Sequence, residues 1–589
     1  MKRLLGLLAA LSILILIAQG AVACKDIIAI GDATAGDYNL LLKVRDPSRP
    51  GLQVLFMVNK SYGYDYHTPW TGRDIHFITQ HKFIGVATKG DVPPDIIKAG
   101  MALSDAGIAY GDADVPSYWI NPTRNAWDDF DWIRYACQSA SSEKEARDLL
   151  IETVTMHAPG VAENLFVVGP EEAFVMEANA FNYAITEVHD IAAMSNYPKE
   201  LWEKNFLKKA FIASSFDKTF EGNVRKGRSV HLGSLLGIKV VGVGEDSAVV
   251  RQVPFGERME IKKGGGKVVG FFRVNVLDCS RKTAKLQVCY EYFTWENEMM
   301  DRIRSKYGSI TPKDMMNWSR LHSDDMRGMC EGKEKAAAVF KIPYNRFDIL
   351  SMGWFAPDQC SSIFIPVHIS DTNIIRAYKN GEASDIALKL LSKFGHGNIT
   401  GDCNRVEDVF ITENDRVEEL TRLIPEDAGK ILTASDTGMQ QQAILMQKIF
   451  LVANDNEGRL VTSAWNSSYR ITLQNMRDII KKIGNNDIKS EFASVALSIA
   501  ERRAEMAKIA KNDNKAMKEY EKGSELITKG RYGEGLKYLV KSYDSADSAL
   551  FGTNVAEITM EEKRNDYTAI AFGIIIAGVL LFFLIRKRL

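Results

Sequence analysis

The sequence lacks an excess of charge of either sign. Its 589 residues include 74 lysines and arginines against 75 aspartates and glutamates, so no basic surface for nucleic acid is indicated. It also lacks a biased composition, because 46% of the residues are hydrophobic and 25% are charged, as in ordinary globular proteins. These absences exclude a nucleic-acid-binding, disordered, collagen-like or small disulfide-stapled protein.

Motifs of several enzyme classes are missing as well. There is no C-x-x-C or H-E-x-x-H, and the nine histidines are scattered, so the pattern supports no metal site. There is no G-x-S-x-G elbow of the serine hydrolases. The segment that starts at Gly242 (GVGE) lacks the third glycine of a dinucleotide fingerprint. We therefore expect neither a metal nor an organic cofactor.

Long uncharged runs occur only at the two ends of the chain. Residues 4–17 follow Lys2 and Arg3 and lead into Ala21-Val-Ala23, the order of a signal peptide (residues 1–23) cleaved after Ala23. An uncleaved anchor is the alternative. Residues 567–585 are uncharged and suit a transmembrane helix, with residues 586–589 as a basic cytoplasmic tail. These ends predict a single-pass protein of the cell membrane whose main part is extracytoplasmic.

Sequons and cysteines fit an exported chain. Four N-x-S/T triplets are compatible with a glycoprotein; they begin at Asn59, Asn317, Asn398 and Asn466. Apart from Cys24, six cysteines remain, an even number that permits up to three disulfide bonds in an oxidising compartment. Cys279 and Cys289 flank a predicted hairpin and are our preferred pair.

The middle of the chain divides into two parts of different character. Short β-rich runs at residues 26–30, 40–44 and 52–58, and strand-dominated stretches at 230–292 and 348–368, are interrupted by helical patterns such as 141–155. This mixture predicts a layered α+β domain over residues 24–400. Residues 401–565 form a mostly helical extension, which we interpret as a spacer. A repeat-type peptide-binding surface is the alternative.

Cleavage after Ala23 would give Cys24 an unusual chemistry. The residue would then carry a thiol and a free α-amine, whose ordinary pKa of about 7.7–8.0 leaves it partly neutral at physiological pH. Such an amine can accept the thiol proton and so activate the sulfur as a nucleophile. A structural cysteine and a lipid-modified cysteine remain as alternatives, since residues 21–24 (AVAC) loosely resemble a lipobox.

The residues after Cys24 carry a family resemblance. Residues 24–46 (CKDIIAIGDATAGDYNLLLKVRD) show a cysteine, a short strand, a Gly/Ala turn, a second strand, a basic residue and an aspartate. Four later stretches continue the pattern; they start at Gly100 (GMALSDAGIA), Asn164 (NLFVVGPEEAFVME), Ala193 (AMSNYP) and Trp354 (WFAPDQCSSIFIP). Together they resemble the N-terminal-nucleophile (Ntn) cysteine hydrolases, most of all the dipeptidase D and acyl-coenzyme A:6-aminopenicillanate acyltransferase families. Choloylglycine hydrolases and penicillin V acylases are more distant.

The resemblance covers Cys24 to about Ser370 and implies a fold and a catalytic set. The fold would be a four-layer αββα Ntn-hydrolase core, followed here by the helical extension and one C-terminal transmembrane helix. Cys24 would attack a carbonyl carbon and form an acyl-thioester. Asp46 would hold the cysteine and its amine, and Asn196 would donate an N–H group to the oxyanion.

The resemblance also implies substrate-binding positions, with two points left open. These positions are Lys43, Arg45, Asp112 and Asp114. Either Lys43 or Arg45 would occupy the pocket beside the nucleophile. Asp112 and Asp114 stand near the place of an asparagine in the acylases. Since a carboxylate repels an oxyanion, a backbone N–H would serve there, or the aspartates would bind a substrate amine.

We therefore expect an extracytoplasmic, membrane-anchored hydrolase of carbon–nitrogen bonds in peptides or N-acyl amides, with no nucleic-acid partner. Two alternatives share the fold: an acyltransferase and a phospholipase B-like lipid hydrolase. A third, from another class, is a non-catalytic surface receptor with a degenerate hydrolase fold.

Overall fold

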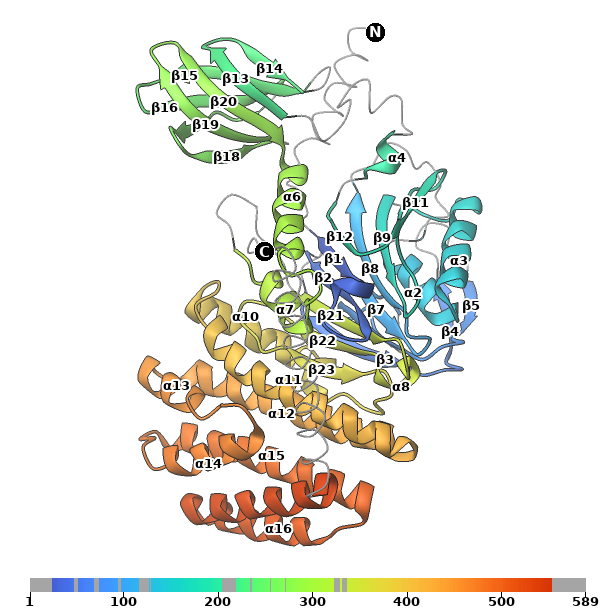
Figure 1. Ribbon diagram of the computed structural model, residues 1–589, viewed down its shortest axis with the longest axis vertical. Coiled ribbons are helices and arrows are strands. Elements are labelled where there is room, and N and C mark those ends of the chain that lie inside the picture. The colour runs from blue at the N-terminus through green and yellow to red at the C-terminus, as the bar shows by residue number, and fades with distance from the viewer. Residues whose placement is uncertain are drawn as a thin grey trace, which may run out of the picture. The chain divides into compact units, whose positions relative to one another are not determined.

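The structure is a computed structural model that describes most of the chain between residues 24 and 552. The described ranges are 24–46, 51–67, 74–93, 97–115, 127, 129–160, 162–196, 198–203, 219–232, 236–254, 256–270, 272–322, 329–330 and 336–552. The chain divides into two compact units, Met1–Glu407 and Asp408–Leu589. Each unit is described by itself (Figure 1).

The first unit is built on two antiparallel sheets. The six-stranded sheet has, in spatial order, β12 (Ile191–Met194), β1 (Lys25–Ala29), β2 (Tyr38–Arg45), β21 (Ala336–Pro343), β22 (Met352–Ala356) and β23 (Ile365–His368). The seven-stranded sheet has β11 (Tyr183–Val188), β10 (Ala173–Ala178), β9 (Ala162–Val168), β8 (Ala109–Val115), β7 (Met101–Ser104), β6 (Phe83–Thr88) and β3 (Gln53–Val58). A separate hairpin pairs β4 (Gly63–His67) with β5 (Asp74–Ile78).

Helices cover the outer faces of both sheets. α2 (Asp129–Ser139) and α3 (Glu143–Thr155) pack on β7, β8 and β9, while α6 (Glu291–Arg304) and α7 (Pro312–Ser319) pack on β12, β2 and β21. The inner faces meet where β1 and β2 contact β8 (Figure 1). The unit also contains η1 (Gly31–Ala33), α4 (Glu200–Glu203), α8 (Phe347–Leu350), α9 (Arg376–Lys379) and α10 (Glu382–Phe394). The α+β prediction is confirmed, and the layers run helix, sheet, sheet, helix.

Local sequence explains why α3 forms where it does. The Ser142 side chain accepts a hydrogen bond from the backbone N–H of Glu145, which satisfies one of the donors that a helix leaves open at its start. Ala146, Leu150 and Val154 then recur at a spacing of four and are all buried. The sequence predicted a helix over residues 141–155. The observed helix begins at Glu143, two residues later, and ends at Thr155 as predicted.

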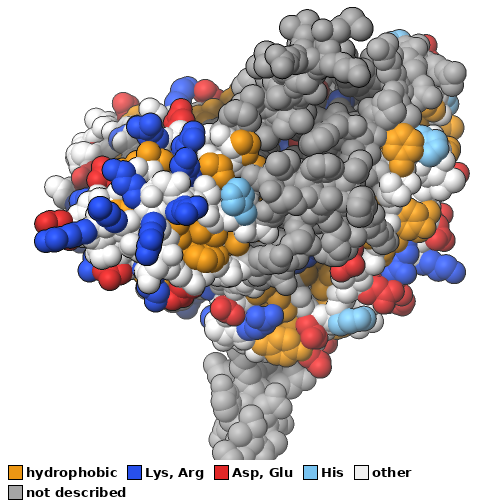
Figure 2. Space-filling view, turned by 90° about the horizontal axis from the view of Figure 1, so that it is seen from above, with side chains coloured by type: hydrophobic (Ala, Val, Ile, Leu, Met, Phe, Trp, Pro, Cys, Tyr) orange, Lys and Arg blue, Asp and Glu red, His pale blue; other side chains and the backbone are white. Residues whose placement is uncertain are grey.

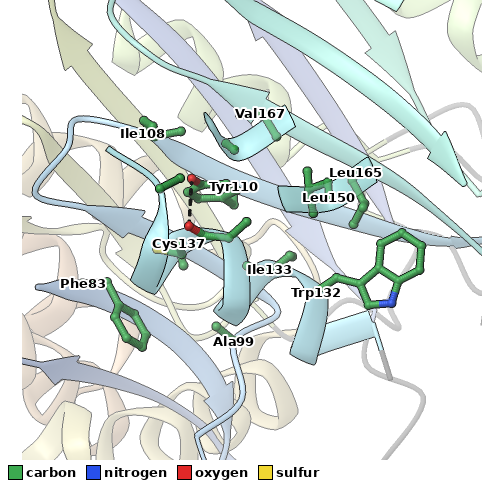
Figure 3. Close-up of a cluster of buried hydrophobic side chains, with 14 of the residues drawn as sticks. Phe83, Ala99, Ile108, Tyr110, Trp132, Ile133, Cys137, Leu150, Leu165 and Val167 are labelled. Atoms are coloured by element: carbon green, nitrogen blue, oxygen red, sulfur yellow. Dashed lines mark hydrogen bonds between the residues drawn. The ribbon is translucent and has the colours of Figure 1, made fainter. Parts of the chain in front are cut away.

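The apolar core lies between α2, α3 and the seven-stranded sheet. Tyr110 and Leu165 from the sheet meet Trp132, Ile133 and Leu150 from the helices, and all five are almost completely buried (Figure 3). The Tyr110 hydroxyl donates a hydrogen bond to the carbonyl of Ala136 at 3.4 Å, so its polar end is satisfied as burial requires. This core fastens α2 and α3 to the sheet that contains β8.

Residues 219–290 form a β-module with a hydrophobic core of its own. One four-stranded sheet contains β13 (Thr219–Arg225), β20 (Thr283–Tyr290), β19 (Phe272–Ser280) and β18 (Gly266–Val269). The other contains β14 (Ser229–His231), β15 (Gly237–Val243), β16 (Ser247–Val253) and β17 (Met259–Lys262). Its surface is rich in lysine and arginine (Figure 2). The strand-dominated stretch predicted over residues 230–292 covers most of these strands, but β13 precedes it and the separate hydrophobic core was not predicted.

The strand register corrects the preferred disulfide. β19 and β20 form the predicted hairpin, but Cys279 lies opposite Ala284 and Cys289 lies opposite Arg273. Directly paired residues are close enough for a disulfide, whereas these two cysteines lie six positions apart along the ladder. All seven cysteines belong to the described residues, and no disulfide joins any of them.

The second unit is helical. Its elements are α11 (Thr400–Leu423, which begins in the first unit), η2 (Pro425–Asp427), α12 (Ala428–Val452), α13 (Asp455–Thr462), α14 (Tyr469–Ile479), α15 (Asn486–Lys511), α16 (Lys515–Thr528) and a last helix over residues 532–552. A buried polar cluster lies inside it, where Arg503 contacts Glu413 and donates to the Tyr543 hydroxyl at 2.7 Å. Pairing of this kind is what permits a guanidinium to be buried.

One part of the predicted fold is wrong. Within the described residues, the structure has no helix that is both long and apolar enough to cross a bilayer. Its longest helices carry charged side chains such as Asp436 and Arg503, which are costly to place in a membrane. The predicted transmembrane helix and the single-pass membrane location are corrected accordingly. Residues 567–585, where that helix was predicted, lie outside the described residues, as do residues 1–23.

Candidate active site

Cys24 lies directly before β1, an inner strand of the six-stranded sheet. β1 pairs with β2 so that Asp26 faces Lys43, and with β12 so that Asp26 faces Met194. Each register, continued by two residues, brings Cys24 level with Arg45 on one side and Asn196 on the other. Three sequence-predicted site residues from distant segments are thus brought to the same level of one sheet.

A buried lysine is the centre of this site. Lys43 Nζ lies 3.3 Å from Asp26 Oδ2 and 3.2 Å from Asp112 Oδ1, and it also donates to the backbone carbonyl of Asp112. Burial by itself lowers the pKa of Lys43, but its interactions with the Asp26 and Asp112 side chains outweigh burial and raise it. Lys43 is therefore a permanent cation, and it joins β1, β2 and β8.

Both carboxyl groups contact this cation. Burial raises the pKa of Asp26 well above its ordinary range, and Lys43 opposes this increase only in part. Burial likewise raises the pKa of Asp112, again against the attraction of Lys43. Asp26 Oδ1 is buried and accepts no hydrogen bond. The site accordingly favours a net charge near zero, with a proton held on the carboxyl groups more readily than in water.

Gly111 in β8 makes room for the lysine and its partner. A Cβ atom at this position would lie 2.5 Å from Asp26 Oδ1 and 3.6 Å from Lys43 Cδ. The first distance is too short for a real contact, so a side chain at this position would have to displace the Asp26 carboxyl group.

The Cys24 thiol is protonated in this environment. Burial raises its pKa to about 12, against the lowering effect of Lys43, and Asp112 adds to the increase. The sulfur lies 4.0 Å from the backbone carbonyl of Asp46. In the full-length chain the Cys24 nitrogen belongs to the peptide bond with Ala23 and cannot act as a base. The uncleaved chain therefore holds a neutral, buried thiol.

Polar contacts tie Cys24 to the end of β12. The Ser195 hydroxyl donates to the carbonyl of Cys24 at 2.9 Å, and Asn164 Nδ2 donates to the carbonyl of Ser195 at 2.7 Å. Asn196 Nδ2 donates to the carbonyl of Asp114 at 2.8 Å. Since Asn164 and Asp114 belong to the seven-stranded sheet, these bonds connect the two sheets at the level of the thiol.

The remaining predicted residues occupy distinct positions. Arg45 is buried, donates to the Gln53 side chain and packs against Gly100, where a Cβ would lie 2.6 Å from its Nε. Lys43 is the cation that contacts both buried carboxyl groups. Asp46 is half-buried, and its backbone carbonyl is the group that contacts the Cys24 sulfur.

The sequence reasoning missed three residues of the site. Asp26 lies two residues after Cys24, so both side chains point to the same face of the sheet. A charged residue in such an apolar strand is rare unless it is paired, and this feature of the sequence could have identified Asp26. The Ser195 contact and the space left by Gly111 depend on a neighbouring strand or on the facing sheet, so no local pattern indicates them.

Donor atoms that suit a metal gather elsewhere in the first unit, at His322, Cys330, Cys360 and His396. Their spacing along the chain follows none of the motifs sought in the sequence. None of the four belongs to the Cys24 site.

Comparisons with known proteins give distant structural likenesses. No family model matches the chain, and no curated protein matches it. Two variants of conjugated bile acid hydrolase from Clostridium perfringens match at 10% and 9% identity, each over 59% of this chain and 94% and 93% of its own, both with a TM-score of 0.34. Penicillin V acylase from Agrobacterium tumefaciens matches at 12% identity over 32% of this chain and 59% of its own, with a TM-score of 0.23. Likenesses this distant do not establish the activity of the chain.

We predict that Gly111→Ala disrupts the site. The added methyl group must displace Asp26, so the free energy of unfolding should fall by about 1–3 kcal/mol, as measured by chemical denaturation. Gly401→Ala is the matched control, because nothing lies within 4 Å of a Cβ there and alanine favours the surrounding helix. Equal stability of Gly111→Ala and the wild-type chain would contradict the proposed close contact.

We also predict that Cys24 of the uncleaved chain reacts slowly with iodoacetamide. With a thiol pKa of about 12, its thiolate fraction at pH 8 is about one in ten thousand, against about a quarter for an ordinary cysteine. Peptide mass spectrometry between pH 7 and pH 10 should show a rate that rises throughout, and the same peptide in urea serves as the control. A rate that levels off below pH 9 in the folded chain would disprove this.

Proposed function

We propose that this chain is an amide hydrolase whose nucleophile is Cys24, made the first residue by removal of residues 1–23. The reaction cleaves carbon–nitrogen bonds in peptides or N-acyl amides through an acyl-thioester. One observation carries the proposal: Cys24 lies directly before a buried inner strand, near the permanent cation Lys43 and level with Asn196. A cysteine with only a structural role requires neither neighbour.

Removal of residues 1–23 supplies the missing base. The freed α-amine of Cys24 takes the thiol proton, and Lys43 favours the resulting thiolate by its charge. The sulfur adds to the substrate carbonyl, and the ammonium then gives its proton to the leaving amine as the C–N bond breaks. Water hydrolyses the thioester, so the acid is released and Cys24 returns with its proton.

Asn196 is suited to stabilise the oxyanion of this reaction. A side-chain amide has two N–H donors, and the bond to the carbonyl of Asp114 uses one of them. The second donor is available to the carbonyl oxygen of a substrate held at Cys24. Because Asn196 is 1% exposed, such a bond would form out of water, where it is strongest.

The carboxyl groups of β8 favour a substrate with a free amine. Asp112 is engaged by Lys43, whereas Asp114 is half-buried and contributes negative charge at the thiol. A negative side chain here opposes an anionic substrate and attracts an ammonium group. Peptides with a free amino terminus therefore fit the site better than N-acyl amino acids.

The nucleophile is tested with the chain in two forms, full-length and beginning at Cys24. We expect hydrolysis of a dipeptide panel only by the second form, and N-terminal sequencing should find Cys24 first with an unblocked amine. Cys24→Ala should reduce kcat/KM at least about a thousandfold, while Cys279→Ala, in the β-module, leaves it unchanged. Full activity of Cys24→Ala, or of chains that start elsewhere, would refute the mechanism.

The oxyanion role is tested with Asn196→Ala in the mature form. Loss of one donor should lower kcat by about a hundredfold to a thousandfold with little change in KM, because the bond strengthens only as the carbonyl oxygen gains charge. Asn223→Ala, at an exposed position of β13, is the control. A change confined to KM would assign Asn196 to substrate binding instead.

A further inference from the structure

Two cysteines and two histidines from four separate segments converge in the first unit. His322 follows α7, Cys330 precedes β21, Cys360 lies between β22 and β23, and His396 follows α10. Their four donor atoms all lie within 4.8 Å of one another. Both cysteines are almost fully buried, at 2% and 1% exposure, and both histidines lie at the surface beside them.

The distances within this group match a metal-binding arrangement. Cys360 Sγ lies 3.2 Å from His322 Nε2 and 2.9 Å from Cys330 Sγ, and Cys330 Sγ lies 3.9 Å from His396 Nδ1. A tetrahedral zinc ion, with bonds of about 2.3 Å to sulfur and about 2.0 Å to nitrogen, separates its ligand atoms by about 3.3–3.8 Å. Small adjustments of the four side chains bring them to that geometry.

Glycines shape the backbone around the two histidines. Gly395 and Gly397 flank His396, and both have positive φ, +76° and +79°, so the turn that ends α10 is one that glycine permits. A Cβ on Gly397 would lie 3.3 Å from His322 Nε2, so the same glycine leaves the space that His322 occupies. The two imidazole rings lie 5.6 Å apart at an angle of 61°.

Hydrogen bonds hold the backbone around the two cysteines. The backbone N–H groups of Cys360 and Ser361 both donate to Asp358 Oδ1 at 3.0 Å, which fixes the turn that carries the first sulfur. The N–H of Cys330 donates to the carbonyl of Leu321 at 3.0 Å, and His322 and Cys330 form an isolated parallel bridge. The backbone therefore presents one histidine and one cysteine together.

A disulfide between Cys330 and Cys360 accounts for less of this arrangement. The two sulfurs are 2.9 Å apart, whereas a disulfide bond measures about 2.05 Å. A disulfide also gives no reason for two imidazole nitrogens to point at the same two sulfurs. Two thiolates and two neutral imidazoles, in contrast, balance the charge of a divalent cation and suit zinc in hardness and in geometry.

We propose that His322, Cys330, Cys360 and His396 bind one structural zinc ion. Binding forms four metal–ligand bonds and releases two thiol protons to solvent. Four protein ligands close the coordination sphere, as in structural rather than catalytic zinc sites. The ion fastens the segments around β21 and β22 to the end of α10. Since β21 pairs with β2, the site supports the sheet that carries Lys43, and it stands independently of the chemistry proposed for Cys24.

The test begins with the metal content of the full chain, purified without a histidine tag and without added metal. Elemental analysis should find about one zinc per chain. Replacement by Co²⁺ should give the intense visible absorption and the sulfur-to-metal charge transfer of a tetrahedral thiolate site. Removal of the metal by a chelator should lower the Tm by several degrees, and added Zn²⁺ should restore it.

Variants assign the ligands. Cys360→Ser and His396→Gln should bind less than a tenth of the zinc of the wild-type chain, while Cys279→Ala and Cys24→Ala retain it. If the ligand variants do not fold, the Co²⁺ spectrum and the chelator effect on the wild-type chain decide the matter. Three results would overturn the proposal: no uptake of Zn²⁺ or Co²⁺, a Cys330–Cys360 disulfide in the native protein, or equal zinc in wild type and ligand variants.

Discussion

The candidate active site depends on one buried ion cluster, in which Lys43 lies between Asp26 and Asp112. A lysine with no exposed surface is stable only when opposite charges surround it, and here they come from the adjacent strand and from the facing sheet. The cluster therefore fixes the distance between the two sheets as well as the charge beside Cys24. Any change that separates the sheets leaves a charge buried without a partner.

In the mechanism proposed above, the same cluster first holds the cysteine inactive and then allows its activation. Burial and the neighbouring carboxyl groups keep the thiol protonated while its nitrogen is part of a peptide bond. The permanent cation already stands beside the sulfur, so only a base is missing. In the proposed mechanism, a freed α-amine supplies that base on the same residue, without requiring movement of Lys43 or of the sheets. Chain cleavage and catalytic competence would then both depend on Cys24.

Local sequence predicted the elements that depend on local physics. The strand that follows Cys24 and the strand that carries Lys43 were indicated by apolar runs between turns, and α3 by its cap and its apolar spacing. The uncharged run near the C-terminus predicted a membrane helix, whereas no helix among the described residues is long and apolar enough to cross a bilayer. The β-module and the pairing of its cysteines were missed because register depends on which strands meet, and an alternating pattern is compatible with several partners.

The sequence by itself determined the chemical types available: one cysteine placed to become a terminal nucleophile, a basic residue and an aspartate after the next strand, and an asparagine further along. Only the tertiary structure decided which of them meet. It selected Lys43 for the contact with both buried carboxyl groups, brought in Asp26, and gathered His322 with Cys360 across a gap of 37 intervening residues. The reason is physical: desolvation and coordination act over a few ångströms in space, while a sequence pattern reports only neighbours along the chain.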